Sequence, residues 1–339
     1  MKRVWMAWVA CVAAGVVLLA ASHVLGPETA PLLGLTQYLP FPAYLGPAVL
    51  ACVGSLWLGW WWRGIAALSL GLCLTVLMGL AWGHADEGHG RVRFMTYNIK
   101  AYMALHRPGG VAELAQEVVE QQPDILVMQD AGQLMDEDEP GAQPLREVLK
   151  RHQIYHFGQY GVASRWPLKD CEVGGIGTLK RSHGFVRCTV TVEGVSLSVV
   201  TVHLVTPRDG LNATREEGMD GLQAWQDNMS ERLAQAGVLA EHLRQAPRPL
   251  VVAGDLNAPE TSVVVQTLLH TGLRDAFSSA GKGYGYTHGH SLLRGWGLSF
   301  LRIDHILVSE DIGVADAWSG GRVGSQHRPV VADLLLHRQ

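Results

Sequence analysis

Seven polar side chains stand in or beside short apolar runs of the chain, where strands would end. The segments MTYNIK, DILVMQD, VVTVHL, VVAGDLN, RIDHIL and GSQHRPV carry Asn98, Asp130, His203, Asp255, Asn257, Asp304 and His327. Carboxylates and amides are ligands for hard cations, and imidazoles and carboxylates transfer protons near neutral pH. One such residue alone is more typical of a cap, a turn or a satisfied core group, whereas the whole set predicts a site.

The segments around these residues alternate between strand and helix patterns. Apolar, β-branched and aromatic residues predict strands at 91–99 (RVRFMTYNI), 123–129 (PDILVMQ), Ser196–His203, Pro249–Ala253, Arg302–Ser309 and Pro329–Leu336. Helical spacing predicts helices over Val111–Val119 and roughly Thr214–Leu243, the second with a core stripe from Leu222 to Leu233. Because ligands bind at the edges of such sheets, we expect one α/β domain over residues 91–339 with the polar set at a common edge.

The first 83 residues differ in composition from the rest of the chain. They hold seven of the 11 Trp residues but only four charged residues, Lys2, Arg3, Glu28 and Arg63. Removing these four from the totals of 27 basic and 31 acidic residues leaves 24 and 30, a formal charge of −6 on residues 84–339. That remainder has no bulk basic character of the kind that holds nucleic acid by counterion release.

Three charge-free apolar runs predict three transmembrane helices, because each is close to the roughly 20 residues that cross the hydrocarbon core. The runs are Val4–Leu25, Ala43–Trp62 and Gly64–Trp82, and Trp residues at their ends suit the membrane interface. We therefore expect residues 1–83 to form a membrane anchor, followed by a polar linker at 84–90 (HADEGHG). The alternative is a group of buried helices in a soluble protein, which would need a large partner surface.

Basic residues predict the orientation of this anchor. Lys2 and Arg3 precede the first span, and Arg63 is expected in the turn between the second and third, which places both points on the cytoplasmic side. The loop at 26–42 has no Lys or Arg, and three crossings would leave the α/β domain outside the cytoplasm. In a bacterium this is a multi-pass inner-membrane protein with a periplasmic domain. A signal peptide ending near Ala20–Ser22 would leave the outcome unchanged.

Two of the five cysteines lie outside the predicted spans. Cys171 and Cys188 each occur in a strand-like segment, DCEV and FVRCTVTV. An oxidising compartment would permit one disulfide between neighbouring strands, and the alternative is a pair of buried free thiols.

The motifs, taken in order, resemble those of the endonuclease/exonuclease/phosphatase superfamily, the DNase I-like metal-dependent phosphoesterases. The most specific motif is GDLNAP, and YNIK, SRWP, TVHL, RIDHIL and HRPV occur in the expected order across residues 91–337. The resemblance implies a four-layer sandwich of two mixed β-sheets flanked by helices, with the site at one edge between the sheets. The membrane anchor is not part of this resemblance.

The resemblance implies that two residues hold a metal. Asp130 stands where the family keeps its metal-binding Glu, Asn98 lies beside it, and such a sparse oxygen shell suits Mg²⁺ or Mn²⁺. The family's Gln-Glu is Gln129-Asp130 here, one methylene shorter, so the metal must sit closer to the backbone or be reached through water. The family's Ser-Asp-His is Ser325-Gln326-His327, and the neutral Gln favours one metal over two.

The other five residues are expected to act on the water and the phosphate. Phosphate-ester hydrolysis brings water to a group ringed with negative charge, so the site needs a base and donors besides the cation. Asp255 would orient or deprotonate the attacking water, and Asn257 would position the water and the phosphate. His203 and His327 would donate to phosphoryl oxygens, and Asp304 would hydrogen-bond His327 and favour its imidazolium.

The sequence leaves the substrate open between nucleic acid and lipid phosphodiesters. The family pattern slightly favours a nuclease, although the domain is acidic and has no basic run with interleaved aromatics. A phospholipid or sphingolipid phosphodiesterase is the alternative, because the segment 287–301 has apolar residues that could press on a bilayer or complete the core. These residues are Leu292, Leu293, Trp296, Leu298 and Phe300.

Three further interpretations stay open. A tethered binding module that has lost turnover through the changes at Asp130 and Gln326 is a second alternative to the active enzyme. His288 and His290 in YTHGH resemble half of a zinc site, but no Cys or HExxH partner lies nearby, which disfavours zinc. Lys100, two residues after Asn98, either reaches a phosphate or is a solvated surface charge.

Overall fold

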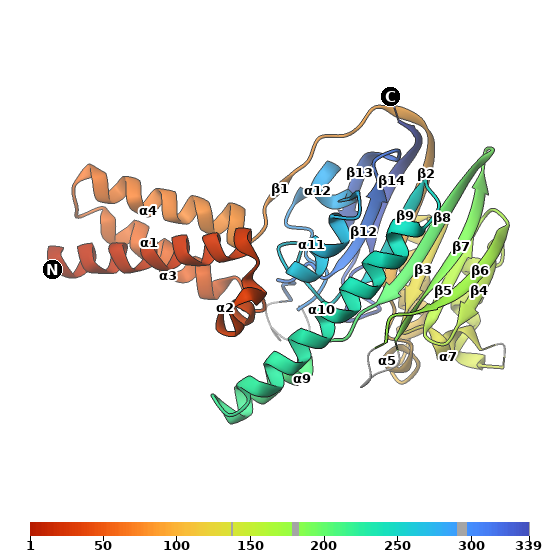
Figure 1. Cartoon of the computed structure of the whole chain (residues 1–339), viewed down its shortest axis with the longest axis horizontal. Helices are drawn as coiled ribbons and strands as arrows, with labels where there is room; N and C mark the ends of the chain where they lie inside the picture. Colours follow the sequence, from red (N-terminus) through yellow and green to blue (C-terminus); the bar gives the residue numbers. More distant parts are fainter. Residues whose placement is uncertain (137, 178–182, 290–296, 339) are drawn as a thin grey trace. The chain divides into compact units, whose positions relative to one another are not determined.

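The computed structural model describes the chain except for residues 137, 178–182, 290–296 and 339 (Figure 1). It divides into two compact units. One comprises Met1–Ala81 with Thr261–Val263, and the other comprises Trp82–Glu260 with Val264–Gln339.

The first unit is helical. Its elements are α1 (Lys2–Leu25), η1 (Pro27–Thr29), α2 (Pro31–Thr36), α3 (Pro42–Ser55), α4 (Trp60–Leu72) and η2 (Cys73–Leu77). Val9, Ala51 and Ala66 are fully buried where α1, α3 and α4 meet, and small side chains at such contacts let apolar helices approach closely. Within the described part of the chain, two helical stretches are long and apolar enough to cross a membrane, Lys2–Leu25 and Trp60–Leu77.

The predicted second span is not confirmed at its expected length. The run Ala43–Trp62 is interrupted at 56–59, between the end of α3 and the start of α4 at Trp60. The 14 residues of α3 extend about 21 Å, less than the roughly 30 Å hydrocarbon core. The prediction that Arg63 lies in a turn is wrong, because the chain turns before Trp60 and Arg63 is already inside α4. Its guanidinium donates to the carbonyl of Leu56 at 2.8 Å, one of the carbonyls left without a helical partner at the end of α3.

In the second unit, the described strands form two six-stranded mixed sheets (Figure 1). The first, called the β9 sheet, has the order β10 (Leu273–Asp275), β12 (Asp304–Ser309), β9 (Leu250–Asp255), β8 (Val195–His203), β7 (Gly184–Val192) and β6 (Leu168–Gly175). The second, called the β2 sheet, has the order β13 (Gly313–Ser319), β14 (Val330–Arg338), β2 (Gly88–Asn98), β3 (Ile125–Gln129), β5 (Tyr160–Ser164) and β4 (Gln153–Phe157). Among the described residues there are two further strands of two residues each, β1 (Ala81–Trp82) and β11 (Lys282–Gly283).

All six strands predicted from the apolar patterns are present, each within three residues of its expected bounds. The pairs β2/β3 and β8/β9 are parallel, and the other pairs within the two sheets are antiparallel. Strand β2 starts at Gly88 because its first residues pair with the end of β14, so the strand includes the last three residues of the expected linker.

Helices cover the outer face of each sheet. The β2 sheet packs on α5 (Ala101–Leu105), α6 (Gly110–Gln121), α7 (Gly132–Met135), η3 (Pro140–Ala142) and α8 (Gln143–Leu149) through one buried apolar cluster. The β9 sheet packs on α10 (Leu222–Gln245) and α11 (Val263–Leu269) through another, and α9 (Arg208–Glu217) and α12 (Ala276–Ala280) complete the helices. This is the predicted arrangement of two mixed sheets flanked by helices, and the strand and helix periods explain it because each element buries one apolar face.

The long helix expected at Thr214–Leu243 is two helices. The first ends at Gly218, whose φ of 62° is costly for residues with a side chain. At Gly221 a Cβ atom would lie 2.2 Å from the carbonyl oxygen of Ala213, so only glycine lets the chain turn back so closely. Of the predicted core stripe, Trp225 and Met229 on α10 are buried, and Leu222 and Leu233 are half-buried.

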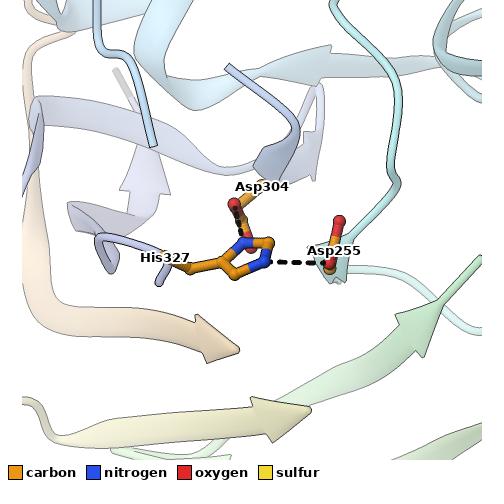
Figure 2. A group of neighbouring side chains, drawn as sticks. All are labelled: Asp255, Asp304 and His327. Carbon is orange, nitrogen blue, oxygen red and sulfur yellow. Dashed lines mark hydrogen bonds and ion pairs between the residues drawn. The ribbon is translucent and has the colours of Figure 1, made fainter. Parts of the chain in front are cut away.

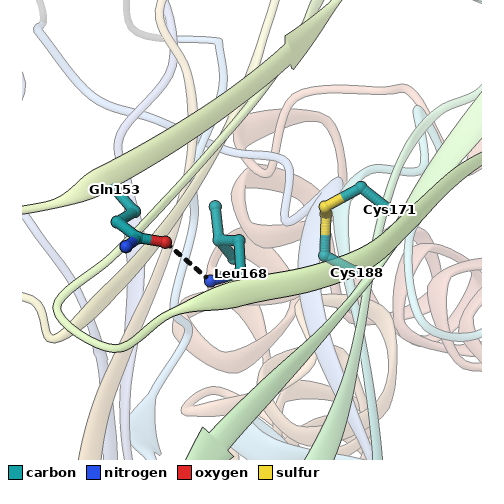
Figure 3. The surroundings of a disulfide bond; sticks show 4 residues. All are labelled: Gln153, Leu168, Cys171 and Cys188. Carbon is teal, nitrogen blue, oxygen red and sulfur yellow. Dashed lines mark hydrogen bonds between the residues drawn. A yellow bond between two sulfur atoms is a disulfide. The ribbon is translucent and has the colours of Figure 1, made fainter.

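A disulfide joins Cys171 on β6 to Cys188 on β7, with a Cα–Cα distance of 4.1 Å (Figure 3). Asp170 and Cys171 together oppose the single residue Cys188, because the register shifts between Lys169 and Glu172. Such a bulge turns one side chain toward its neighbour. Of the two states left open by the sequence, the structure contains the disulfide.

Candidate active site

Three neighbouring strands of the β9 sheet place three predicted residues side by side. Asp255 is the last residue of β9 and is the register partner of His203, the last residue of the parallel strand β8. It is also the register partner of Asp304, the first residue of the antiparallel strand β12. The ends of β8 and β9 and the start of β12 therefore lie side by side at one end of the sheet, which we call its edge.

The β2 sheet brings Asn98 and Asp130 to its own edge in the same way. Asn98 and Gln129 end the parallel strands β2 and β3 as register partners, and Asp130 follows directly. Gln129 is fully buried, and its Nε2 donates to Oγ1 of Thr201 on β8 at 2.9 Å. This hydrogen bond connects the two sheets beneath the site, so the two edges lie against each other.

Asp255 is the point where the two edges meet. Its side chain is 1% exposed, and its Oδ2 accepts a hydrogen bond from Nδ2 of Asn98 at 2.8 Å. Its Oδ1 accepts from the backbone N–H of Asn257 at 2.9 Å. The Nε2 atom of His203 lies 3.4 Å from Oδ2. The hydrogen bonds from Asn98 and Asn257 fix the orientation of the carboxylate.

His327 lies between two carboxylates (Figure 2). Its Nδ1 is 2.9 Å from Oδ2 of Asp304, and its Nε2 is 3.7 Å from Oδ2 of Asp255. The hydrogen bond between Asp304 and His327 agrees with the sequence-based expectation. The expected imidazolium does not: burial lowers the pKa of His327 to about 4 and raises the pKa of Asp304 to about 6. Desolvation of the charged ring therefore outweighs the attraction of the carboxylates.

Asp255, Asp304 and His327 also offer three potential metal-ligand atoms within 4.8 Å of one another. A neutral imidazole has one donor nitrogen and one acceptor nitrogen. With Nδ1 donating to Asp304, Nε2 has a free lone pair beside Asp255, an arrangement suited to accepting a proton.

Asp130 lies among cationic and polar groups at the other end of the site. Its Oδ2 is 2.6 Å from Nζ of Lys100, and its Oδ1 is 3.6 Å from Nδ1 of His203. Burial alone would raise the pKa of Asp130, but His203 and Lys100 together hold that pKa below its usual value. Lys100 is therefore neither free nor simply solvated, because its side chain is only 19% exposed and pairs with this carboxylate.

The two predicted metal ligands present oxygen atoms to a cationic residue. Oδ1 of Asn98 accepts the backbone N–H of Lys100 at 3.3 Å, and Oδ2 of Asp130 accepts its ammonium group. One carboxylate and one amide oxygen at a shared edge fit a hard cation such as Mg²⁺ or Mn²⁺.

Three residues of the site have a left-handed backbone conformation. Among the described residues, six other than glycine have a positive φ, and three of them are Lys100 (47°), Asp130 (50°) and Asn257 (53°). A left-handed conformation is costly for residues with a side chain, and such residues concentrate at functional sites.

Asn257 belongs to the site through its backbone. Its side-chain Nδ2 donates to the carbonyl oxygen of Leu204 at 2.9 Å, while its own carbonyl accepts from Arg232 at 2.8 Å. The residue therefore orients Asp255 through its N–H, and its contact with water or phosphate stays a prediction.

Three residues to which the sequence analysis gave no catalytic or metal-binding role support the site. Gln159, in the turn between β4 and β5, places Oε1 at 2.7 Å from Nδ1 of His203. Ser325 donates to the carbonyl of Asn98 at 2.7 Å and accepts the N–H of His327 at 3.1 Å. The ring of His288 packs 4.5 Å from that of His327, and burial lowers the pKa of His288 to about 3. Gln159 lies in no recognisable motif, whereas Ser325 was visible in the Ser-Gln-His segment.

A cavity of about 490 Å³ opens beside Asp130. It is lined by Lys100, Ala101, Tyr102, Met103, Asp130, Gly132, Gln133, Gly158 and Gln159. Tyr102 and Met103 are 63% and 47% exposed, so an aromatic ring and a thioether are available beside the site.

Part of the predicted apolar loop lies outside the described residues. Leu292, Leu293 and Trp296 belong to that part, as does His290 of the histidine pair considered for zinc. Of the rest of the loop, Phe300 is buried and Leu298 is 39% exposed.

Solved structures share this fold at low sequence identity. The endonuclease/exonuclease/phosphatase from Bacteroides vulgatus is 18% identical with a TM-score of 0.55, and the match covers 73% of this chain and 99% of that chain. D. rerio TDP2 complexed with single strand DNA product is 16% identical with a TM-score of 0.54, covering 72% and 98%. The human Nocturnin catalytic domain is 20% identical with a TM-score of 0.50, covering 74% and 94%.

Comparison with family models assigns the chain to a family. No curated protein sequence matches the chain. The model of the Endonuclease/Exonuclease/phosphatase family matches residues 95–327, a range that contains all seven predicted site residues. The match covers more than half of the chain and agrees with the shared fold. The protein therefore belongs to the endonuclease/exonuclease/phosphatase family.

Proposed function

We propose that this protein is a membrane-anchored, divalent-metal-dependent phosphodiesterase. The observation that carries the proposal is the meeting of Asn98, Asp255 and His327 from three distant segments, with Asp304 behind His327. A phosphodiester needs an oriented water, a proton acceptor and donors to the developing anion, and these side chains supply such groups in one place.

Asn98 and Asp130 would hold the cation, which is Mg²⁺ or Mn²⁺ by the chemistry of the two ligands. When bound, the ion would polarise the phosphoryl group. Asp255, oriented by Asn98 and the N–H of Asn257, would orient or deprotonate the water. His203 would donate to a phosphoryl oxygen.

The state of His327 revises its expected role. Its lowered pKa leaves the ring neutral at pH 7, with Nε2 facing Asp255. Nε2 would accordingly accept a proton from water in concert with Asp255, and Asp304 would stabilise the ring once it is charged.

Hydrolysis of bis-(p-nitrophenyl) phosphate by the full chain in detergent tests the enzymatic proposal. We expect Mg²⁺- or Mn²⁺-dependent release of p-nitrophenol, reduced at least about a thousandfold by Asp255→Ala or His327→Ala. The exposed Asp227→Ala serves as the matched control on α10. No turnover with either ion, or turnover unaffected by both site variants, would leave a tethered binding module.

We favour a nucleic acid as the substrate. The cavity beside Asp130 exposes Tyr102, whose ring offers a face on which a base can stack. A protein of the same fold is described as a complex with a single-stranded DNA product, which supports this choice. The lipid alternative is supported by the anchor and by the exposed side chain of Leu298.

A side-by-side assay of plasmid DNA, single-stranded RNA and phospholipid vesicles distinguishes these substrates. For a nuclease, Tyr102→Ala lowers cleavage of the polynucleotide about tenfold, as expected for one lost stacking contact. Preference for vesicles, abolished by Trp296→Ala and insensitive to Tyr102→Ala, would establish the lipid alternative instead.

We further propose that the catalytic domain lies outside the cytoplasm, which in a bacterium is the periplasm. Two crossings would return the chain to the side of Lys2, whereas three place the domain on the opposite side. The disulfide between Cys171 and Cys188 supports three, because disulfides persist in oxidising compartments. Helix α3 with its flanking residues would then make the third crossing. A reporter fused after Gln339 tests this placement, and activity of a reporter that works only in the cytoplasm would refute it.

A further inference from the structure

The ammonium group of Lys100 forms an ion pair with the carboxylate of Asp130. The Nζ–Oδ2 distance is 2.6 Å, and the two side chains are only 19% and 31% exposed. Shielding from water strengthens such a pair relative to one on the open surface.

The backbone is shaped to make this pair. Lys100 and Asp130 both have left-handed φ values, and the N–H of Ala101 donates to the carbonyl of Asp130 at 2.9 Å. The N–H of Lys100 also donates to Oδ1 of Asn98 at 3.3 Å. Lys100 therefore engages the oxygen atoms of both residues that the proposed function assigns to the metal.

We infer that Lys100 is a built-in competitor of the divalent cation, which must displace its ammonium from Asp130 in order to bind. This inference rests on the proposed function, because it takes Asp130 as a metal ligand. Two positive charges at one short carboxylate repel each other, and an Asp offers less reach than a Glu for holding both. The flexible stem of Lys100 also lines the 490 Å³ cavity, which leaves room for the ammonium to move away.

Binding of Mn²⁺ to the full chain in detergent, followed by isothermal titration calorimetry, tests the exchange without relying on turnover. Lys100→Met keeps the alkyl stem and removes the charge, and we expect it to bind Mn²⁺ about tenfold more tightly than the unchanged protein. Lys150→Met is the matched control, because Lys150 pairs with Glu147 at the exposed surface. We expect this variant to bind Mn²⁺ as tightly as the unchanged protein. Lys100→Gln is a second neutral variant, and a thermal unfolding scan of each variant verifies that it is folded.

Asp130→Asn distinguishes a failure of the proposed competition from a failure of the proposed metal site. We expect it to weaken Mn²⁺ binding, and we expect the tightening by Lys100→Met to vanish in the double variant. If Asp130→Asn weakens binding but neither Lys100 variant tightens it, the competition is refuted while the proposed metal site stands. If Asp130→Asn binds Mn²⁺ as well as the unchanged protein, the proposed metal site is refuted, and the competition with it.

Discussion

The Nδ1 atom of His327 lies 2.9 Å from Oδ2 of Asp304, although 23 positions separate the two residues along the chain. Both side chains are almost fully buried, at 3% and 1% exposure. Burial raises the pKa of Asp304 and lowers the pKa of His327, so it favours the neutral form of both groups. The ionisation of this pair should therefore control catalysis.

We expect kcat/KM to fall as the pH drops below about 6, the pKa of Asp304. The sign follows from the raised pKa: on acidification Asp304 gains a proton where an ordinary Asp stays ionised, and it then cannot stabilise a charged His327. The measured midpoint belongs to the coupled pair. Asp304→Asn should lower activity by about 10²- to 10⁴-fold and remove this acidic limb. If the fall in kcat/KM at low pH persists unchanged in Asp304→Asn, another group is responsible for it.

Gln159→Leu should lower kcat/KM roughly tenfold while leaving thermal stability nearly unchanged. The variant removes the oxygen 2.7 Å from Nδ1 of His203, so the ring is no longer held toward Asp255. Gln133→Leu is the control, because it changes the same cavity lining without a contact to His203 in the structure. Equal activity of the two variants would show that Gln159 does not position His203.

Arg302→Met should lower the free energy of unfolding by about 3–5 kcal/mol, because it removes one partner of a buried ion pair. Arg302 donates to Asp275 at 2.8 Å and also to Glu260, and Asp275 is 1% exposed. Arg244→Met is the control and should cost less than about 1 kcal/mol, since Arg244 and Glu241 are exposed. Urea denaturation measures both, and similar losses would contradict a special role for the buried pair.

The same network predicts how stability depends on pH. Arg302 and His305 overcome the effect of burial and hold the pKa of Asp275 well below its usual value. A depressed folded-state pKa stabilises the protein above the unfolded value of about 3.9, and this contribution is lost as the pH falls further. In Asp275→Asn the urea midpoint should change less between pH 5 and pH 3 than in the unchanged protein. Equal changes would exclude Asp275 as a source of acid sensitivity.

Replacing both cysteines, Cys171→Ser with Cys188→Ser, should lower the free energy of unfolding of the oxidised protein by about 2–4 kcal/mol. The bond closes a loop of 17 positions and joins strands β6 and β7. Adding a reductant should destabilise the unchanged protein by a similar amount and leave the double variant unaffected. Identical urea midpoints of the two proteins under oxidising conditions would show that the bond contributes no stability.

Local patterns in the sequence were sufficient to predict most of the helices and strands and to identify the residues that form the site. The six predicted strands, the helix at Val111–Val119 and the core stripe of α10 follow from the period of apolar residues, which one segment carries by itself. The order of the motifs also placed Asn98, Asp255 and His327 in one set, and the structure brings them together. The break of the long helix at Gly218–Gly221 was less visible, because two glycines do not reveal how closely the chain approaches Ala213.

Only the tertiary structure decided the electrostatics of the site and the length of α3. The neutral ring of His327 depends on burial from several elements at once, and the pair of Lys100 with Asp130 depends on two left-handed residues in separate loops. The support of His203 by Gln159 and the disulfide between Cys171 and Cys188 likewise need strands to be neighbours. Residue type and spacing reveal which groups are available, whereas distances between remote segments, and the pKa values that follow from them, arise only when the two sheets pack together.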